Sequence, residues 1–281
     1  MSPIHPTAIV ETGAELAEDV QIGPFCHVGP KVVIGAGTRL LSHVVVHGRT
    51  TLGECNTVWP FASLGGDPQD LKFEGEDSEL LIGSHNEIRE NVTIHKGTDN
   101  DAGVTRVGDH NLLMVGCHVG HDCILHNHIV MANGALLAGH VEIKDCASLG
   151  GAAALHHFVT VGEYAYIGGM TRIVADVPPF MLSEGNPSRI RNVNKIGLLR
   201  HQFPEDEIGN IVDAFRRLFR HAEDQHMPGQ TAKAMAELEA EYPDNPHIRK
   251  LIEALHRSAE GIHGRYRETL RKDDTFSNPV R

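Results

Sequence analysis

The sequence predicts an all-β, left-handed parallel β-helix followed by a small α-helical domain. The first observation is a six-residue repeat: large apolar residues occupy every sixth position over residues 4–64, 82–94 and 107–173. The second is that a small residue often follows four positions later. The third is a change to helical spacing beyond about residue 180.

A period of six fits neither the 3.6 residues of a helical turn nor the two-residue alternation of a strand, so each hexad is a short strand and a corner. Three hexads close one triangular coil of eighteen residues, and stacked coils form a parallel β-helix. The large and the small residue both point inward, because so narrow a prism cannot hold two large side chains on each side. We assign residues 1–180 to this rod.

Two excursions interrupt the repeat, at residues 66–81 and 95–106. If they leave the coil phase intact, five hexads stack in one column, and both excursions leave the rod from it. These hexads begin at Leu64, Ile94, Val119, Leu137 and Leu155.

Residues 181–281 form the predicted helical domain, which caps the carboxyl end of the rod. Apolar residues at helical spacing between Ile208 and Phe219 follow a proline and three acids that suit a first helical turn. Two shorter amphipathic stretches surround Leu238 and Leu251. We expect a flexible tail from about residue 271.

Charge is divided unevenly along the 281 residues, whose formal net charge is −12. Residues 1–177 hold 9 basic and 21 acidic side chains, whereas residues 178–281 hold 16 of each. Nucleic acid is therefore not an expected partner. A local basic surface could instead dock an acidic partner or a phosphate. It contains Arg189, Arg191, Lys195, Arg200, Arg216, Arg217 and Arg220.

Three of the five cysteines, Cys26, Cys117 and Cys123, occupy inward small positions, and Cys55 and Cys146 fall at corners. This pattern favours core filling in a reducing compartment over a disulfide or zinc framework. The repeat begins at residue 4 without an apolar leader, and no run of eighteen apolar residues occurs. We expect a cytoplasmic protein without membrane insertion, metal site or cofactor.

Histidines gather at the column from which the excursions leave. The repeat places seven residues along one edge of the rod: Asp70, Lys72, His95, His121, Gly139, His140 and His156. Most of the 20 histidines must be surface or packing residues, but loops on a rigid scaffold are where sites are built. We therefore expect this edge to be functional.

The residues of the edge suit acyl transfer. Histidine can take a proton from a hydroxyl or an amine near neutral pH, and Asp122 could fix the tautomer of His121. Gly139, one coil away, offers a backbone N–H as an oxyanion donor. No serine or cysteine presents itself as a nucleophile, so direct attack by a substrate hydroxyl is the simpler mechanism. We expect His121 at an exposed corner outside the packed interior.

Seven motifs, in this order, resemble the UDP-N-acetylglucosamine 3-O-acyltransferases of lipid A biosynthesis. They are residues 4–10 (IHPTAIV), 22–25 (IGPF), 69–73 (QDLKF), 88–95 (IRENVTIH), 118–123 (HVGHDC), 137–141 (LAGHV) and 176–180 (DVPPF). The resemblance covers roughly residues 1–260. It implies transfer of a 3-hydroxyacyl chain from acyl carrier protein to the 3-hydroxyl of UDP-N-acetylglucosamine, in a homotrimer with sites between neighbouring rods.

The resemblance also implies roles for single residues. His121 matches the general base, Asp122 its partner and the Gly139 amide the oxyanion donor. The matching substrate-contacting positions are Asp70, Lys72, His95, His118, His140 and His156. Asn194 and Arg200 match residues that approach the nucleotide from the adjacent subunit, and Gly169 matches the position that sets acyl-chain length.

The sequence departs from the family at several positions. His157, which we include among the substrate-binding residues, stands where glutamine is common, and Pro187 and Ile196 replace polar residues. The chain beyond about residue 262 exceeds the usual length. A UDP-sugar with a 3-amino group therefore remains an alternative acceptor.

Three other functions compete with this one. The related N-acyltransferase is disfavoured because it carries an additional amino-terminal domain. A metal-dependent lyase resembling γ-class carbonic anhydrase would use histidines across a trimer interface, and His121 and His126 have one suitable spacing. A non-catalytic scaffold would leave the His121–Asp122 pair and the two excursions unexplained.

Overall fold

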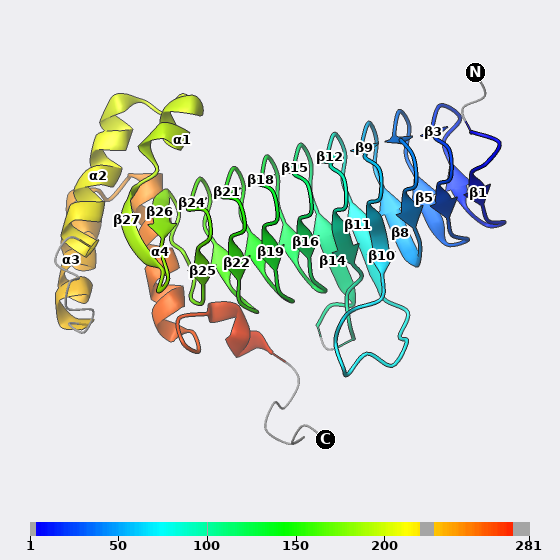
Figure 1. The fold of residues 1–281 in the computed structure, drawn as a ribbon. Coiled ribbons are helices and arrows are strands. Elements are labelled where there is room, and N and C mark those ends of the chain that lie inside the picture. The colour runs from blue at the N-terminus through cyan, green and yellow to red at the C-terminus, as the bar shows by residue number, and fades with distance from the viewer. Residues whose placement is uncertain (1–3, 100, 220–227, 272–281) are drawn as a thin grey trace.

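The computed structural model describes residues 4–99, 101–219 and 228–271. Its main body is the predicted left-handed parallel β-helix, and the helical domain lies against the carboxyl end of this rod (Figure 1). Residues 272–281, most of the expected tail, lie outside the described residues, as does Arg220 of the expected basic surface.

Each wall of the rod is a sheet in which every strand pairs in parallel with the strand one coil away. The first wall contains β1 (Ile9–Val10), β4 (His27–Val28), β7 (Val45–Val46), β10 (Ser63–Gly66), β13 (Thr93–His95), β16 (His118–Val119), β19 (Leu136–Leu137), β22 (Ala154–Leu155) and β25 (Arg172–Ile173). The second contains β2 (Glu15–Leu16), β5 (Val32–Ile34), β8 (Arg49–Leu52), β11 (Glu79–Ile82), β14 (Val104–Val107), β17 (Ile124–Leu125), β20 (Glu142–Ile143) and β23 (Thr160–Val161). The third contains β3 (Gln21–Ile22), β6 (Arg39–Leu40), β9 (Thr57–Val58), β12 (Glu87–Ile88), β15 (Leu112–Leu113), β18 (Val130–Met131), β21 (Ser148–Leu149) and β24 (Tyr166–Ile167).

The interior of the rod is a continuous column of apolar side chains. Val119 and Leu137, from neighbouring coils, are fully buried, and Cys26, Cys117 and Cys123 fill inward positions as predicted. Burying one such aliphatic side chain contributes about 1.5 to 3 kcal/mol. The stacked interior therefore gives the corners a rigid support.

The corners between the first and second walls hold side chains in line. The chain turns there through residues in the left-handed region, and in successive coils these are Asp122, His140 and Phe158, with φ of 58°, 63° and 65°. A short polar side chain tolerates this conformation. The rings of His140 and Phe158 stack, with their centroids 4.3 Å apart.

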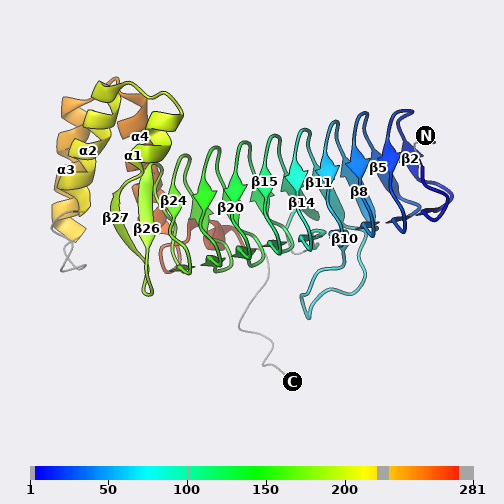
Figure 2. The same cartoon turned by 45° about the horizontal axis from the view of Figure 1, so that its top comes forward.

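Both excursions leave from the first wall, as predicted, but they are shorter than expected. The long loop, residues 67–78, joins β10 to β11, and the short loop, residues 96–103, joins β13 to β14. We expected residues 66–81 and 95–106. Residues 79–81 and 104–106 instead belong to the second wall, because β11 and β14 pair with each other over four residues. The long loop projects from the side of the rod (Figure 2).

A β-hairpin precedes the helices of the carboxyl-terminal domain. Residues 181–193 were expected in the helical domain, but β26 (Met181–Glu184) pairs with β24 of the third wall, and β27 (Arg189–Val193) pairs with β26. This pairing satisfies backbone groups that would otherwise form an open sheet edge.

The helices follow as α1 (Lys195–Arg200), α2 (Glu205–Phe219), α3 (Pro228–Glu241), α4 (Pro246–Glu260) and the 3₁₀ helix η1 (Tyr266–Leu270). The helices α2, α3 and α4 match the three predicted stretches, and their apolar faces form a second core. The sequence did not predict α1, because six residues are too few for a periodic pattern. Within the described residues, no helix is long and apolar enough to cross a membrane.

Candidate functional site

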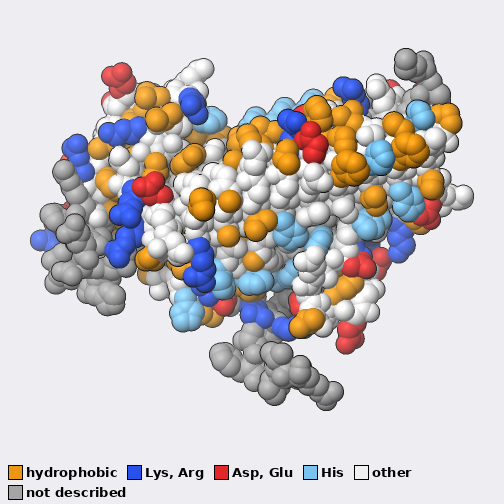
Figure 3. All heavy atoms as spheres, viewed as in Figure 1, with side chains coloured by type: hydrophobic (Ala, Val, Ile, Leu, Met, Phe, Trp, Pro, Cys, Tyr) orange, Lys and Arg blue, Asp and Glu red, His pale blue; other side chains and the backbone are white. Residues whose placement is uncertain are grey.

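Five strands of the first wall stack in the predicted column. The order β10–β13–β16–β19–β22 is continuous, and His118 and Val119 lie beside Leu136 and Leu137 of the next coil. The corners after these strands form one edge of the rod, beside the two loops. Figure 3 shows histidine side chains gathered near the long loop.

His121 and Asp122 form a hydrogen-bonded pair at the corner after β16. Nδ1 of His121 lies 2.8 Å from Oδ2 of Asp122, whose side chain is 1% exposed. Thr98 of the short loop donates to the same carboxylate, from its amide at 2.9 Å and from its hydroxyl at 2.7 Å. The carboxylate therefore favours the tautomer of His121 with hydrogen on Nδ1, which leaves Nε2 free to accept a proton.

The expectation that His121 lies at an exposed corner is wrong. The residue is only 9% exposed. The ring of His140 meets it edge-on with the centroids 5.0 Å apart, and the short loop reaches its partner Asp122 through Thr98. The repeat gives the position of a corner but not the path of a loop that folds over it. Exclusion of water strengthens electrostatic interactions in such a site.

Gly139 lies directly against the His121 ring. A Cβ atom at Gly139 would stand 2.5 Å from both Cε1 and Nε2 of His121, closer than any such contact allows. Its backbone N–H donates to no acceptor among the described residues. The absence of a side chain thus places an available N–H donor beside the nitrogen that can accept a proton.

His140 extends the network on the other side of Asp122. Its Nδ1 lies 3.1 Å from Oδ2 of Asp101 in the short loop, and its Nε2 lies 3.9 Å from Oδ2 of Asp122. The side chain of His140 is 10% exposed. Asp122 therefore orients the buried imidazole of His121, and Asp101 orients that of His140.

Three histidines line the wall on the amino-terminal side of His121. The rings of His95 and His118 meet edge-on with centroids 4.9 Å apart, and Nδ1 of His118 lies 2.8 Å from Oγ1 of Thr93. Burial, then the neighbouring histidines, lowers the pKa of His95 to about 4, and burial lowers the pKa of His47. Neutral imidazoles can exchange hydrogen bonds with an uncharged hydroxyl or amide.

Asp70 and Lys72 lie on the long loop. Oδ1 of Asp70 accepts a bond from the backbone N of Lys72 at 3.0 Å, and the Lys72 side chain is exposed. The loop is tied to the rod by Lys96, which pairs with Asp67 at 3.0 Å and lies over the Phe73 ring. Lys96 therefore couples the long loop to the start of the short one.

His156 and His157 follow β22, one coil beyond Gly139. Their rings meet edge-on with centroids 5.4 Å apart, and Nδ1 of His156 lies 3.2 Å from the carbonyl oxygen of His157. His156 is half-buried and His157 is exposed. Both lie on the predicted edge.

Within residues 4–99, 101–219 and 228–271, one group of residues could hold a metal ion. Ligand atoms of His121, Asp122 and His140 lie within 4.8 Å of one another. Oδ2 of Asp122 already accepts from the Thr98 hydroxyl and lies 2.8 Å from Nδ1 of His121. His126, which the lyase alternative requires, lies 2.9 Å from Glu142 after β17 and is not part of this group.

Both the rod and the carboxyl-terminal domain contain segments that match known protein families. A family model described as "Udp N-acetylglucosamine O-acyltransferase; Domain 2" matches residues 176–263, and one described as "Bacterial transferase hexapeptide (six repeats)" matches residues 13–48. An acyl-[acyl-carrier-protein]–UDP-N-acetylglucosamine O-acyltransferase of Verminephrobacter eiseniae is 45% identical over 244 residues, which cover 86% of this chain and 92% of the relative. The chain belongs to the UDP-N-acetylglucosamine O-acyltransferase family.

Other members of the family agree with this assignment. The relative from Rhizobium johnstonii is 42% identical over 241 residues, which cover 86% of each chain. The crystal structure of UDP-N-acetylglucosamine O-acyltransferase from Moraxella catarrhalis superposes with a TM-score of 0.84 at 40% identity, over 89% of this chain and 95% of that one.

Three residues to which the resemblance gives a role lie away from the histidine column. Gly169 follows β24 at an exposed corner of another edge, where the nearest atom to an added Cβ would be the Gly151 oxygen at 3.3 Å. Asn194 caps α1, accepting from the Gly197 amide at 3.1 Å, and Arg200 is exposed at the end of that helix.

The sequence did not single out four residues that the structure adds to the site: His47, Lys96, Thr98 and Asp101. His47 precedes the long loop in the same column of corners, and its buried Nε2 has no partner among the described residues. Counting back eighteen residues from the corner at Gly65 would have found it. The other three lie in or beside the short loop, where the repeat gives no register.

Proposed function

We propose that this protein transfers a 3-hydroxyacyl chain from acyl carrier protein to the 3-hydroxyl of UDP-N-acetylglucosamine, the first step of lipid A biosynthesis. The names of its relatives support the two substrates. The observation that carries the proposed chemistry is the pair of His121 and Asp122, which lies against Gly139, whose backbone N–H has no acceptor within the part of the chain that the structure describes.

In the proposed mechanism Nε2 of His121 removes the proton from the sugar hydroxyl as its oxygen attacks the thioester carbonyl. Asp122 stabilises the imidazolium that forms, through the bond to Nδ1. The Gly139 N–H donates to the oxygen that becomes negative in the tetrahedral intermediate. Collapse of the intermediate breaks the carbon–sulfur bond, and the imidazolium returns the proton to the departing thiolate. The ester and the free carrier-protein thiol are the products.

We also propose that the remaining residues of the edge bind substrates. These are Asp70, Lys72, His95, His118, His140, His156 and His157, with Gly169 limiting the length of the acyl chain. Burial lowers the pKa of His95, His118 and His157, and neutral imidazoles support recognition of the uncharged sugar because they can donate or accept hydrogen bonds. A 3-amino sugar remains an alternative acceptor, since a neutral base can take a proton from an attacking amine as well.

A homotrimer is part of the proposal. Asn194 and Arg200 lie beyond β25, and β25 is three coils from β16, about 14 Å along the rod at ordinary strand spacing. This separation supports a role for them at the site of an adjacent subunit. We place the enzyme in the cytoplasm, and the proposed reaction uses no cofactor.

The test is the His121→Ala variant, assayed with an acyl carrier protein thioester and UDP-N-acetylglucosamine. We expect kcat to fall by about 10²- to 10⁴-fold, as is typical for loss of a general base. Asp122→Asn should cost less, because Asp122 acts through His121. The control is His27→Ala, which removes another histidine–carboxylate pair, 2.7 Å from Glu11, at the far end of the same wall.

Near-normal turnover by a folded His121→Ala trimer would exclude His121 as the base. The same assay after extensive chelation separates the lyase alternative, since acyl transfer by His121 should persist. Loss of activity together with loss of a bound zinc ion would favour the metal-dependent reaction.

A further inference from the structure

The end of the described chain returns to the rod as a strap, residues 261–271. The strap follows α4 and includes η1, which lies beside the carboxyl-terminal coils in Figure 1. Most of it follows residue 263, where the match to the family model ends. It contributes Tyr266, Arg267 and Leu270 to a cavity of about 350 Å³ between α4 and the second wall.

Backbone bonds fix the strap to the last coil. The amide of Asp176 donates to the Gly264 oxygen at 2.8 Å, and the Asp176 carboxylate accepts from the Tyr266 amide at 2.9 Å. Arg265, which is 6% exposed, donates to the Val174 oxygen at 2.7 Å. The position of Arg267, which directly follows Tyr266, is therefore set by the fold rather than by its own side chain.

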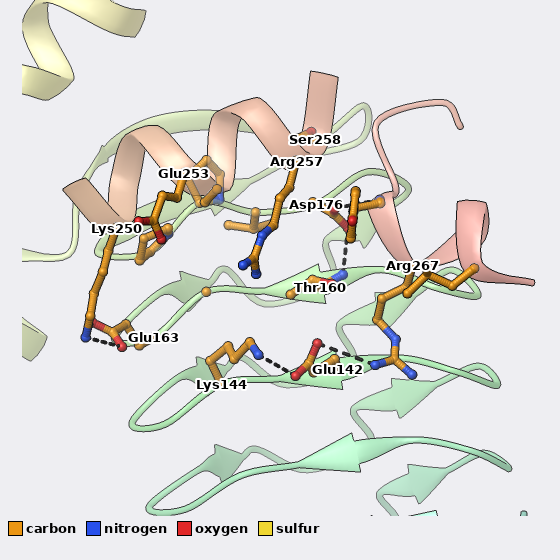
Figure 4. A pocket seen from close by; sticks show the side chains of 17 residues that line it. Glu142, Lys144, Thr160, Glu163, Asp176, Lys250, Glu253, Arg257, Ser258 and Arg267 are labelled. Carbon is orange, nitrogen blue, oxygen red and sulfur yellow. Dashed lines mark hydrogen bonds and ion pairs between the residues drawn. The ribbon is translucent and has the colours of Figure 1, made fainter. Parts of the chain in front are cut away.

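The Arg267 guanidinium reaches three groups of the rod. Its Nε donates to the backbone oxygen of His140 at 3.1 Å, Nη1 lies 3.5 Å from Oε2 of Glu142, and Nη2 lies 3.8 Å from Oδ2 of Asp101. Figure 4 shows Arg267 extending from the strap to Glu142 on β20. The side chain is only 17% exposed.

Glu142 is a stable anion at this point. Burial would raise the pKa of Glu142, but hydrogen bonds from His126 and Lys144, and the charges of Lys144 and Arg267, outweigh burial and lower it to about 2. The guanidinium is thus held between two carboxylates. The planar donors of a guanidinium can interact with both carboxylates and with a carbonyl oxygen at once, which a lysine ammonium cannot do.

We propose that Arg267 is a positioning residue for the acyl-transfer reaction, and this inference rests on the proposed function. It fixes the backbone of His140 and the carboxylate of Asp101, which together orient the His140 ring. That ring meets His121 edge-on, and the short loop that carries Asp101 also carries Thr98, which holds Asp122. The carboxyl-terminal strap thereby sets the geometry of the base from outside the repeat.

The test compares Arg267→Met with Lys250→Met. Lys250 also joins the carboxyl-terminal domain to a glutamate of the rod, Glu163 at 2.7 Å (Figure 4), and among the described residues it has no hydrogen bond or ion pair with His140 or Asp101. We expect Arg267→Met to lower kcat about tenfold, as for a small misplacement of a catalytic group, and to raise KM by a smaller factor because His140 is also a proposed substrate-binding residue. Arg267→Lys should recover part of the loss, and Lys250→Met should keep full kcat.

A double-mutant cycle with Asp101→Asn makes the test specific. If Arg267 acts through Asp101, the double variant should lose little more than the worse single variant. Independent, multiplying losses would overturn the proposal, as would equal kcat values for Arg267→Met and Lys250→Met. Failure of the wild-type protein to transfer the acyl chain would instead reject the proposed function, so the two failures are distinguishable.

Discussion

Gly139 shows how a missing side chain shapes the candidate site. Its backbone occupies the space against the His121 ring, and an added Cβ would overlap Cε1 and Nε2 at 2.5 Å. Asp122 holds the other side of the ring through Nδ1. The imidazole is therefore held between Asp122 on one side and the Gly139 backbone on the other.

Gly139→Ala should therefore displace the His121 ring and lower kcat. A shift of about 1 Å in a catalytic group can cost on the order of 10²-fold in rate. The control is Gly209→Ala on α2, where a Cβ would meet nothing within 4 Å. Steady-state kinetics of the two variants decide the point, and unchanged kcat for Gly139→Ala would show that the ring is not confined.

Among single residues, the sequence predicts those whose positions the repeat fixes. His121, Asp122 and Gly139 could be predicted because each has a fixed place within an eighteen-residue coil. Thr98 and Asp101 could not, because they lie on a loop whose path depends on contacts with Asp122 and His140. The burial of His121 was missed for the same reason.

At the scale of elements, the corner after β24 is the proposed limit on the acyl chain. Gly169 is exposed there beside Met170, which is 82% exposed, so a longer side chain would project outward from the rod. Gly169→Met should therefore shorten the space for the acyl chain. Excluding two methylenes costs about 1.6 kcal/mol, or roughly a fifteenfold fall in kcat/KM for long thioesters.

A series of acyl carrier protein thioesters of increasing length measures this effect. Shorter donors should be used as well as before, because their chains end before the corner. If Gly169→Met leaves the preference unchanged, the acyl chain does not pass Gly169.

The strap should make stability depend on pH through Asp176. Burial raises the pKa of Asp176 to about 6, although the amides of Tyr266 and Thr160 oppose the rise. The native state therefore binds a proton more tightly than the unfolded chain. The resulting stability is fully present below about pH 4 and is lost as pH rises through about 6; a shift of two units is worth roughly 2 to 3 kcal/mol.

Asp176→Asn removes this titration. The thermal midpoint of the wild type should fall relative to that of the variant between pH 4.5 and pH 7.5, because only the wild type loses this contribution. Parallel midpoints at both values would mean that Asp176 does not titrate in this range. Other carboxylates, such as Glu142, titrate in both proteins and cancel in the comparison.

Elements were predictable where a period repeats and less so where it ends. The strands, the column and the helices α2 to α4 follow from spacing alone. The hairpin of β26 and β27 did not, because its pairing with β24 depends on where the last coil leaves an open edge. The loop bounds were too wide because strand pairing continues into β11 and β14.

For the whole molecule, charge separates the rod from its carboxyl-terminal domain. On the face shown in Figure 3, lysine and arginine side chains gather at the helical end. Arg217 does not belong to a free basic surface, since it pairs with Asp213 and Glu241, each at 2.7 Å. Arg189 and Arg191 on β27 are exposed and better placed to meet an acidic carrier protein.

Arg191→Glu should accordingly raise KM for acyl carrier protein, roughly threefold at low salt, and leave KM for the sugar nucleotide unchanged. The difference from wild type should shrink as added salt screens the interaction. Arg39→Glu, on β6 near the other end of the rod, carries the same charge change as a control. Equal effects of the two substitutions would mean that Arg191 acts only through the net charge of the protein.

The stacking of coils also restricts how such a chain can evolve in length. Inserting one residue within a hexad would turn every later side chain of that coil away from its proper face. Adding eighteen residues would instead extend the rod by one complete coil. The two loops are the exception: they contain 12 and 8 residues and lie between strands without disturbing the column. New acceptor specificities should therefore arise by exchange of these loops, while the coils beneath them change only by substitution.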